Sequence, residues 1–496
     1  MWALVADLER AASRADWDLV VDDDGIHPVS RLLADSDALA ASWRRHFSRP
    51  PTVLVQADNS WTTVLLTLVV GRLGGTVALI NRNATRSDFL AACEDIRPDA
   101  LVCDDGSLET WDPAAVGLAP TATAIDGWTL SVAPAARGAE RWNGGVLIGL
   151  TSGSTGRAKG VVQSEAALRY AADQTIAAVG LKPGDPVAVI VPLSSTASFC
   201  FGVYLGLRLG STLGLWREWN PAAIVAGMRA RLVTWTMCVP TMALQLAGAA
   251  TAPIPSLRAM TVGGGPMDQS VLADAEEALG TKILRVFGMS EVLGHTTPLP
   301  TDHPDLRLGR DGRPFPGTAV RAVDKTGRRV PPGERGRAEV RGPSVFLGYA
   351  RDGSVQPPPL SDDGFFATGD IVIVHDDGFV TIAGREKDVI IRGGRNIDIV
   401  EVERAVAAHP DVSDVSVGPV PDPILGERIA ALVVTSREDL DLGDVTRFLA
   451  EQGIAKTKWP EFLFRTEHLP LTQVGKISRP AVRAMLRDRH SAVTNG

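Results

Sequence analysis

The chain has 496 residues, too many for one ordinary hydrophobic core, so we expect two or more domains. Hydrophobic residues make up 45% of the chain and charged residues 22%, which is ordinary for a soluble globular protein. The net charge is -8 and no basic stripe is visible, which argues against nucleic acid as the main partner.

The N-terminus, the cysteines and one long uncharged segment predict a cytoplasmic protein without a membrane span. Residues 1–9 lack the basic start and apolar core of a signal peptide. The four cysteines have no metal-ligand spacing and read as small buried residues in a reducing compartment. Residues 187–207 are uncharged and long enough to span a membrane, but Pro192 and a following polar cluster favour a buried strand, turn and helix.

Short apolar runs alternate with Ala- and Leu-rich stretches through the first two-thirds of the chain. We expect strands at 52–55, 101–102, 146–150, 187–191 and 232–234, and helices at 222–231 and 269–279. This alternation predicts an α/β fold with largely parallel sheets.

The pattern changes in the last third. Residues 317–382 favour short strands and turns. A smaller unit then follows, with helices expected at 400–409 and 443–452 and strands at 412–417 and 429–434. We place the domain boundary within 384–388, which divides residues 1–384 from residues 385–496.

A loop rich in glycine and hydroxyl residues follows the strand expected at 146–150. It reads Thr151-Ser152-Gly153-Ser154-Thr155-Gly156-Arg157-Ala158-Lys159-Gly160. Glycines bring backbone N–H groups close to an anion, hydroxyls add donors, and the lysine adds a mobile positive charge. It is not a Walker loop, because Lys159 is not followed by Ser or Thr. The run predicts a phosphate-binding loop of another kind, with a flexible linker as the alternative.

Two further clusters could hold the rest of a nucleotide. In Gly263-Gly264-Gly265-Pro266 the glycines would let a flat ring lie on the backbone, although a plain turn is the alternative. Phe287-Gly288-Met289-Ser290-Glu291 offers an aromatic face, a hydroxyl and a carboxylate able to hold Mg²⁺. Its alternative is a core phenylalanine beside a helix-capping serine.

Two later clusters place a carboxylate and a lysine on glycine turns. Asp370 follows Gly369 and could accept hydrogen bonds from both ribose hydroxyls, or could be an ordinary turn aspartate. Lys476 follows Gly475 near the C-terminus. Such a lysine is usually a solvated surface charge, and its position behind the other four clusters makes it a candidate catalytic residue.

Together the five clusters resemble the adenylate-forming superfamily, which includes acyl- and aryl-CoA synthetases, peptide-synthetase adenylation domains and firefly luciferase. The resemblance extends over residues 50–486 and includes the segments 384–388, 391–397 and 421–427. It implies an α/β fold in which a large N-terminal domain of layered sheets and helices binds ATP and the acid, and a smaller α+β C-terminal domain forms a mobile lid. It also implies an enzyme that makes an acyl-adenylate from a carboxylate and MgATP and releases pyrophosphate.

The resemblance implies a role for each residue that matches a family motif. The β- and γ-phosphates would be held by Thr151, Ser152, Gly153, Ser154, Thr155 and Lys159. Adenine would be framed by Gly264, Gly265, Pro266 and Phe287, with Asp370 and Arg385 on the ribose. Ser290 would contact the α-phosphate, Glu291 would bind Mg²⁺, and Lys476 would offset the repulsion between the α-phosphate and the attacking oxygen. Lys387 matches the hinge about which the lid swings between two half-reactions.

The acid-binding region departs from the family pattern. Many acyl- and aryl-CoA synthetases carry an aromatic residue or a histidine after a Pro-Leu pair, but here Pro192-Leu193 is followed by Ser194-Ser195-Thr196. The gate is therefore smaller and more polar. Residues 192–203 contain no acid to bind an α-ammonium group, which argues against α-amino acids. The candidate pocket residues are Ser195, Thr196 and His295, the last with a structural role as its alternative.

Three functions stay open on the sequence. The first is a ligase that uses ATP and Mg²⁺ to join a carboxylic acid, an aromatic one among the candidates, to CoA. The second keeps adenylation but uses a carrier-protein thiol or an amine as acceptor, or a small oxyanion such as nitrite in a diazotase-like reaction. The third is a non-catalytic nucleotide-binding protein, against which the intact residues Lys159, Glu291, Asp370 and Lys476 argue.

Overall fold

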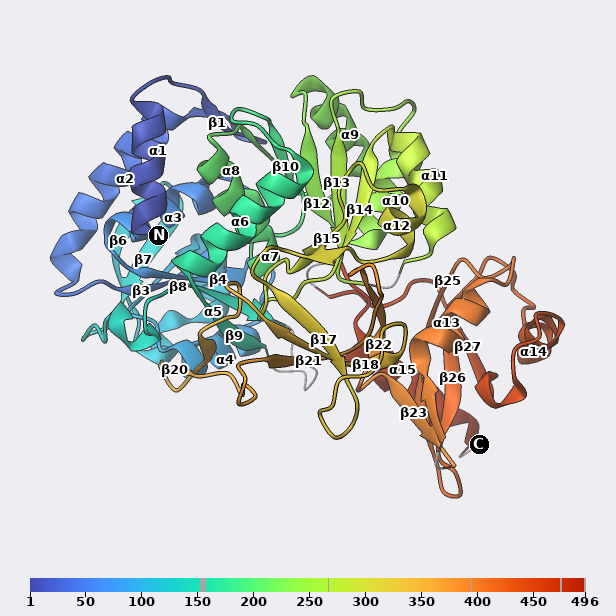
Figure 1. Cartoon of the computed structure of the whole chain (residues 1–496). Helices are drawn as coiled ribbons and strands as arrows, with labels where there is room; N and C mark the ends of the chain where they lie inside the picture. Colours follow the sequence, from blue (N-terminus) through green and yellow to red (C-terminus); the bar gives the residue numbers. More distant parts are fainter. Residues whose placement is uncertain (152–157, 266, 394, 473–474, 495–496) are drawn as a thin grey trace.

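The computed structural model describes residues 1–151, 158–265, 267–393, 395–472 and 475–494. Figure 1 shows a large N-terminal part built of sheets and helices and a smaller C-terminal part beside it. Within the described part of the chain, no helix is long and apolar enough to cross a membrane.

Nine strands form the sheet that carries the predicted phosphate loop. In order across the sheet they are β20 (Ser354–Gln356), β19 (Gly348–Arg351), β9 (Lys159–Ser164), β8 (Gly145–Thr151), β4 (Thr76–Asn81), β3 (Thr52–Ala57), β5 (Ala100–Asp104), β7 (Trp128–Val132) and β6 (Ala119–Ile125). The central strands β8, β4, β3 and β5 run parallel, and the outer pairs are antiparallel. Every residue of β3 and β4 is buried, as expected for strands covered on both faces.

Seven strands form a second large sheet. In order they are β14 (Lys282–Val286), β13 (Ala259–Gly263), β12 (Trp235–Cys238), β10 (Val187–Val189), β11 (Leu213–Leu215), β1 (Asp18–Asp22) and β2 (Gly25–Pro28). Every neighbouring pair is parallel except β1 with β2. The carboxyl ends of the parallel strands therefore share one edge, which is where α/β sheets bind ligands.

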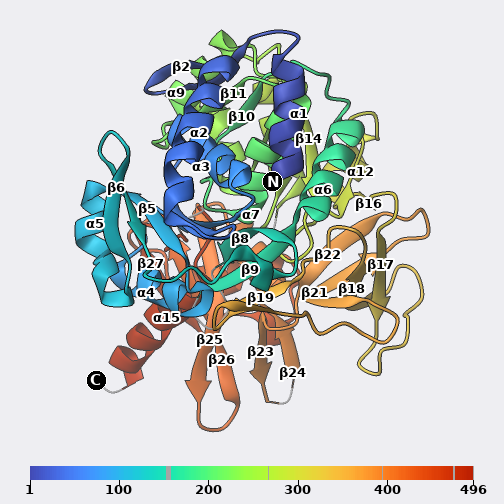
Figure 2. The ribbon, with the colours of Figure 1, turned by 90° about the vertical axis from the view of Figure 1, so that its left-hand side faces the viewer.

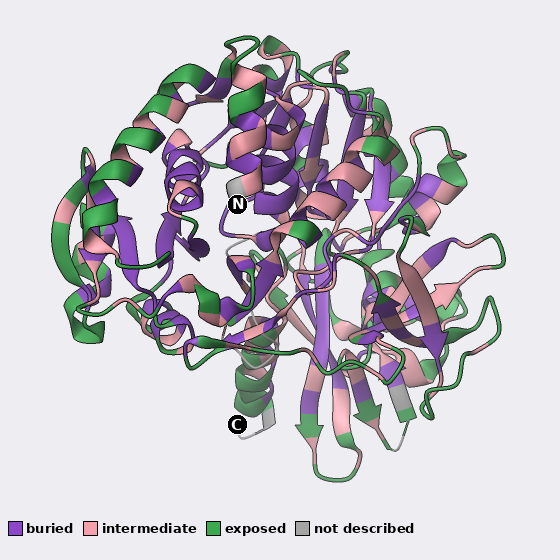
Figure 3. Cartoon of the chain, turned by 60° about the vertical axis from the view of Figure 1, so that its left-hand side comes forward, coloured by how far each residue is buried: buried purple, intermediate pink, exposed green. Residues whose placement is uncertain are grey.

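Helices cover these two sheets and pack between them (Figure 2). They are α1 (Trp2–Ala12), α2 (Val29–Trp43), α3 (Trp61–Arg72), α4 (Arg86–Ile96), α5 (Asp105–Trp111), α6 (Glu165–Val179), α7 (Thr196–Ser198), the π-helix η4 (Phe199–Tyr204), α8 (Leu205–Leu209), α9 (Pro221–Ala230), α10 (Pro240–Ala249), α11 (Gln269–Leu279) and α12 (Pro304–Gly309). Buried residues follow the central strands, and exposed residues follow the outer faces of the helices (Figure 3).

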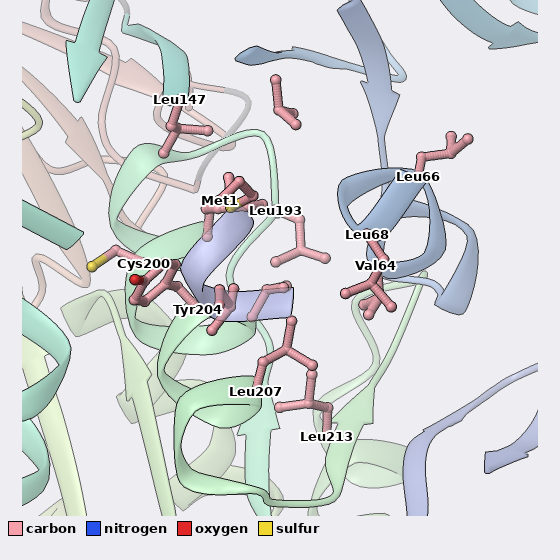
Figure 4. Close-up of a cluster of buried hydrophobic side chains, with 14 of the residues drawn as sticks. Met1, Val64, Leu66, Leu68, Leu147, Leu193, Cys200, Tyr204, Leu207 and Leu213 are labelled. Atoms are coloured by element: carbon pink, nitrogen blue, oxygen red, sulfur yellow. The ribbon is translucent and has the colours of Figure 1, made fainter. Parts of the chain in front are cut away.

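The largest hydrophobic core includes residues of α3, η4 and α8, and helix α1 packs against both α3 and α8. Helix α3 is buried from Thr62 to Gly71, so it packs on several sides at once. Figure 4 shows Leu193, Leu207 and Leu213 gathered toward Val64 and Leu68 of α3. This core fixes η4, whose N-terminal side carries the predicted acid gate.

A four-stranded antiparallel sheet connects the two large sheets to the C-terminal part. Its strands are β17 (Ala319–Val323), β18 (Arg335–Arg341), β21 (Phe366–Val374) and β22 (Val380–Arg385), and a small pair is formed by β15 (Thr296–Thr297) and β16 (Arg313–Pro314).

The C-terminal part is a five-stranded sheet with helices. Its elements are β23 (Val389–Arg392), β24 (Arg395–Asp398), α13 (Ile399–Ala407), β25 (Asp414–Asp422), β26 (Gly426–Val434), α14 (Leu442–Glu451), β27 (Phe462–Thr466) and α15 (Arg479–Thr494). It has its own apolar core, which includes Ile390, Val417 and Leu449. A turn at residues 386–388 separates it from β22.

Most predicted elements lie where the sequence places them, and one does not. Residues 187–207 form a strand, a turn and a helix, as expected. The strand expected at 232–234 is wrong, because β12 begins at Trp235. Leu232 instead occupies a turn with φ of 52° and is exposed, while the apolar Val233 is buried in that turn. The apolar pair alone could not distinguish a buried turn from a strand.

Candidate functional site

The loop that carries Lys476 is docked on the carboxyl-end edge of the seven-stranded sheet. The hydroxyl of Thr241, at the start of α10, donates a hydrogen bond to the carbonyl of Gly475 at 3.1 Å. The Lys476 ammonium lies against Gly264, where an added Cβ would collide with it. Gly264 also has φ of 88°, in the left-handed region that favours glycine. Two clusters far apart in the sequence thus meet at one point.

Asp370 and Arg385 lie directly opposite one another on β21 and β22. The Arg385 Nε donates to the Asp370 carboxylate at 3.1 Å. Asp370 is only 5% exposed, and burial raises the pKa of its carboxyl while the Arg385 charge opposes the rise. The arginine therefore favours the ionised form that can accept two hydrogen bonds.

The surroundings of Lys476 make its charge sensitive to pH. Desolvation of the ammonium by surrounding protein atoms is the main cause that lowers the pKa of Lys476 to about 8. The Arg385 charge adds to the lowering, and the Asp370 charge opposes it. Solvent still reaches the exposed surface of Lys476, and this water screens the effect. The three charged residues thus form one electrostatic group.

The predicted phosphate loop connects β8 and β9. Its ends, Thr151 and Lys159, are paired across the two strands, and the Thr151 hydroxyl donates to the Lys159 carbonyl at 3.4 Å. Ser152, Gly153, Ser154 and Thr155, predicted to bind phosphates, lie outside the described residues. The paired strands hold both ends of the loop at the edge where the parallel strand β8 ends.

Ser290 and Glu291 contact the strand that comes after this loop and the neighbouring strand β19. The Gln163 side-chain amide donates to the Ser290 carbonyl at 2.7 Å. The Tyr349 hydroxyl donates to a Glu291 carboxylate oxygen at 2.9 Å. The Lys159 ammonium lies 5.2 Å from the centroid of the Tyr349 ring. The predicted Mg²⁺ ligand and Lys159, which ends the predicted phosphate loop, therefore contact the same tyrosine.

The donor set near Glu291 fits Mg²⁺ bound together with a nucleotide. Among the residues that the structure describes, no group of three or more His, Cys, Asp or Glu side chains could cage a metal ion. Mg²⁺ is commonly held by one or two carboxylates plus substrate phosphates. One carboxylate beside a phosphate loop meets that requirement.

The candidate adenine residues differ in how far they can face a nucleotide. Gly264 and Gly265 lie just beyond the end of β13, and Pro266 is outside the described residues. Phe287 is only 4% exposed and packs edge-on against His295, with ring centroids 4.3 Å apart. Most of the surface of the Phe287 ring therefore packs in the core and cannot contact a nucleotide.

Two of the three candidate acid-binding residues carry a buried polar atom for which the described residues give no partner. Ser195 precedes α7, and the buried Thr196 packs against Gly149 of β8. His295 is fully buried, and burial lowers the pKa of its ring to about 4, so the imidazole is neutral. One ring nitrogen of His295 lies 3.1 Å from the Val292 carbonyl. Among the residues that the structure describes, the Thr196 hydroxyl and the other His295 nitrogen have no hydrogen-bond partner.

A separate cavity of about 410 Å³ lies beyond the carboxyl ends of β1, β3 and β5. Its walls include Asp58, Trp61, Asp104 and Arg217, and none of the predicted site residues lines it. The catalytic assignment therefore rests on the contacts around Lys476 rather than on cavity size.

Sequence reasoning missed the residues that connect the predicted clusters. Tyr349, Gln163 and Thr241 make these connections through contacts between strands or helices distant in sequence. Tyr349 is one of three tyrosines, and its sequence neighbours give it no local chemical signal. The pairing of β19 with β9, which brings it to the site, is a property of the fold.

The chain belongs to the family of AMP-binding enzymes, the adenylate-forming ligases. Residues 8–350 match the family described as AMP-binding enzyme, and residues 401–476 match the AMP-binding enzyme C-terminal domain. This membership confirms the resemblance found in the sequence, and with it the expectation of an AMP-forming ligase. Enzymes of this family use ATP and generally Mg²⁺.

Two relatives show the range of similarity. The chain is 31% identical over 520 residues to a salicylyl-CoA synthase / salicylate adenylyltransferase of a Streptomyces species, covering 98% of this chain and 94% of the relative. It is 35% identical over 342 residues to triostin synthetase I of Streptomyces triostinicus, an alignment that covers 68% of this chain and 64% of the relative.

The fold is also that of a solved family member. ATP-bound MatB from Rhodopseudomonas palustris superposes with a TM-score of 0.84 at 26% identity, covering 98% of this chain and 99% of MatB. The apo form of the same protein gives a TM-score of 0.72. These matches confirm the α/β fold with a large N-terminal and a smaller C-terminal domain. The present arrangement resembles the ATP-bound form more than the apo form.

Proposed function

We propose that this protein adenylates an aromatic carboxylic acid with MgATP and transfers the acyl group to the thiol of CoA. The contact of the Lys476 ammonium with Gly264, beside Asp370 and Arg385, carries this proposal. A cation at this point would face the α-phosphate of a nucleotide lying on the glycine edge. It would offset the repulsion between that phosphate and the attacking carboxylate.

The other residues receive roles that agree with their positions. Lys159, with Thr151 and the loop residues between them, would hold the β- and γ-phosphates. Ser290 would contact the α-phosphate, and Glu291 would bind Mg²⁺. The buried Asp370 carboxylate would accept hydrogen bonds from the ribose hydroxyls, with Arg385 maintaining its charge.

Gly264 and Gly265 would support adenine through their backbone. Phe287 would contribute the edge of its ring, since the rest packs in the core. Pro266 lies outside the described residues, and its proposed role at the adenine rests on the sequence motif alone.

Two observations support a polar substituent on the acid. The Thr196 hydroxyl and one His295 nitrogen are buried and find no partner among the described residues, and such groups are costly unless a ligand satisfies them. Salicylate, named for one relative, is an aromatic acid with a hydroxyl group of this kind. We therefore propose a hydroxylated or similarly polar aromatic acid, with Ser195, Thr196 and His295 lining its pocket.

The alternative acceptor is a carrier-protein thiol or an amine, and the alternative acid is a small oxyanion such as nitrite. The polar gate after Leu193 favours neither acceptor over CoA. These alternatives share the adenylation step and differ in the second step of the reaction, so one experiment separates them.

We also propose that residues 385–496 form a mobile lid that turns about Lys387. The turn at residues 386–388 joins two separate sheets, and a hinge absorbs its rotation in a few such residues. Rotation would withdraw Lys476 after adenylation and bring Gly393 and Gly394 to the side from which the thiol would approach. The four cysteines are free and buried, which supports the reducing environment of the cytoplasm as its location.

Pyrophosphate release tests the proposed function. We would measure it over a panel of acids, including benzoate, salicylate, a straight-chain fatty acid and nitrite, with and without CoA. Release that depends on an aromatic acid and ends in an acyl-CoA is the expected result. Release without a thioester would favour a carrier protein or an amine, and release with nitrite alone would favour the diazotase-like reaction. No release with any acid would contradict adenylation.

A further inference from the structure

Tyr349 stands between the two groups proposed to bind the phosphates and Mg²⁺. Strand β19 lies beside β9 (Figure 2). The register of this pair places Tyr349 opposite Val161, two residues from Lys159. The ring receives the Lys159 ammonium at 5.2 Å from its centroid, and the hydroxyl donates to Glu291 at 2.9 Å. One side chain therefore contacts a cation on its face and an anion at its tip.

The position of Tyr349 relative to Glu291 is fixed by the backbone as well. The Phe346 N–H donates to the Glu291 carbonyl at 2.8 Å, and Val345 forms an antiparallel bridge with Val292. The segment leading into β19 thus holds the backbone of Glu291 while Tyr349 holds its carboxylate. On the other side, β19 is hydrogen-bonded to the strand that carries Lys159.

We propose that Tyr349 is a positioning residue that keeps the Lys159 ammonium and the Glu291 carboxylate apart and ready for MgATP. This inference rests on the proposed function of the site. A lysine and a glutamate that approach each other freely tend to form an ion pair, and such a pair would occupy the groups that the nucleotide and the metal ion need.

Tyrosine suits this position because it gives each group a partner that leaves its main capacity free. The hydroxyl occupies one oxygen of Glu291 and leaves the other for a metal ion. The ring face attracts the ammonium through its quadrupole without accepting its N–H bonds, so the ammonium can turn to a phosphate. The hydroxyl is the donor in this contact, because an ionised carboxylate can only accept a hydrogen bond.

The test compares Tyr349→Phe with the unchanged protein by calorimetric titration of ATP at increasing Mg²⁺ concentration. This substitution keeps the aromatic ring and removes the hydroxyl. We expect the Mg²⁺ concentration for half-maximal ATP binding to rise about tenfold, while ATP binding without Mg²⁺ stays within about twofold. Tyr349→Leu, which also removes the ring, should weaken ATP binding with and without Mg²⁺.

Tyr170→Phe is the matched control. The Tyr170 hydroxyl also makes two hydrogen bonds, to the Pro316 carbonyl and to Thr318, but it contacts neither Lys159 nor Glu291 in the structure. An unchanged Mg²⁺ dependence in this variant would show that losing a bound phenol hydroxyl elsewhere does not cause the shift.

Two results would overturn the inference. One is a Mg²⁺ dependence of Tyr349→Phe equal to that of the unchanged protein. The other is an equal loss of ATP binding with and without Mg²⁺, which would mean a general structural role. If the unchanged protein binds MgATP but no acid supports pyrophosphate release, the proposed function fails while the role of Tyr349 is still decided by the titration.

Discussion

The charge of Lys476 depends on its neighbours, and this dependence gives the protein a testable pH response. An ordinary lysine stays protonated well above neutral pH, whereas protein atoms and Arg385 together lower the pKa of Lys476 to about 8. The protonated form is the one that can offset negative charge during adenylation. Activity should therefore be present below this pKa and lost as the pH rises through it.

We expect kcat/KM for acid-dependent ATP–pyrophosphate exchange to fall above about pH 8. The pH profile of kcat/KM is the measurement, because it reports groups of the free enzyme. In the profile of kcat the fall should move to higher pH, since bound phosphates stabilise the ammonium. A kcat/KM profile that stays level to about pH 10 would mean either that the pKa of Lys476 is not lowered or that its charge is not needed.

The sequence singles out candidate site residues where they lie in a local motif, and the role of each one stays a prediction. Thr151, Lys159, Asp370 and Lys476 each stand on or beside a glycine turn whose composition suggests its chemistry. Phe287 shows the limit, because the sequence could not tell an aromatic face that meets a nucleotide from a ring that packs in the core. Its burial depends on residues from β17, β18, β21 and β22, far from it in the chain.

At the scale of elements, the segment just after β13 is where the seven-stranded sheet contacts the loop that carries Lys476. Gly264 is at the point of closest approach, with a left-handed backbone and no room for a side chain. The sequence predicted a glycine surface for a flat ring at this position, with a plain turn as the alternative, and a lysine at the other cluster. It could not predict their contact, because docking depends on the start of α10 and on Thr241.

Replacing Gly264 with alanine should therefore reduce both stability and activity. The left-handed backbone should cost about 1 kcal/mol of the free energy of unfolding. The collision of the new Cβ with the Lys476 ammonium should reduce ATP–pyrophosphate exchange by at least about tenfold. Denaturant unfolding and exchange assays measure the two effects.

Gly378→Ala is the control for Gly264→Ala, because it introduces the same backbone strain without a collision of the new Cβ. Gly378 has φ of 81°, but nothing lies within 4 Å of an added Cβ. This variant should lose similar stability and keep full exchange activity. If Gly264→Ala also kept full exchange, the close approach of Lys476 would not be part of the reactive arrangement.

The strands themselves were predicted best where they are short, apolar and buried on both faces. The runs at 52–55 and 146–150 became β3 and β8, and the helix predicted at 269–279 matches α11. The order of strands across the sheets, which places β19 next to β9, was not predictable from local pattern. Strand order depends on the packing of the whole chain rather than on any one run.

At the scale of the whole molecule, the arrangement of the two parts resembles that of ATP-bound MatB. The superposition is better on ATP-bound MatB than on its apo form, and the Lys476 loop is docked in the N-terminal part. The same arrangement cannot also serve a thiol acceptor if Lys476 blocks its approach. A swing about the turn at residues 386–388 would resolve this conflict.

Lys387→Pro should block the second step and spare the first. Proline fixes φ near about -65° and so prevents the backbone change that a hinge requires. We expect ATP–pyrophosphate exchange within about threefold of the unchanged protein and thioester formation reduced at least about tenfold. Equal rates of both steps would mean that Lys387 is not the hinge.

The central claim is that Lys476 drives adenylation from its place on the glycine edge, and Lys476→Ala tests it most directly. We would measure acid-dependent ATP–pyrophosphate exchange and ATP binding in the same preparation. The account predicts that exchange falls by at least about a hundredfold while ATP binding changes by less than about threefold, because the lysine acts on charge that develops during reaction. Exchange at the rate of the unchanged protein would contradict the account.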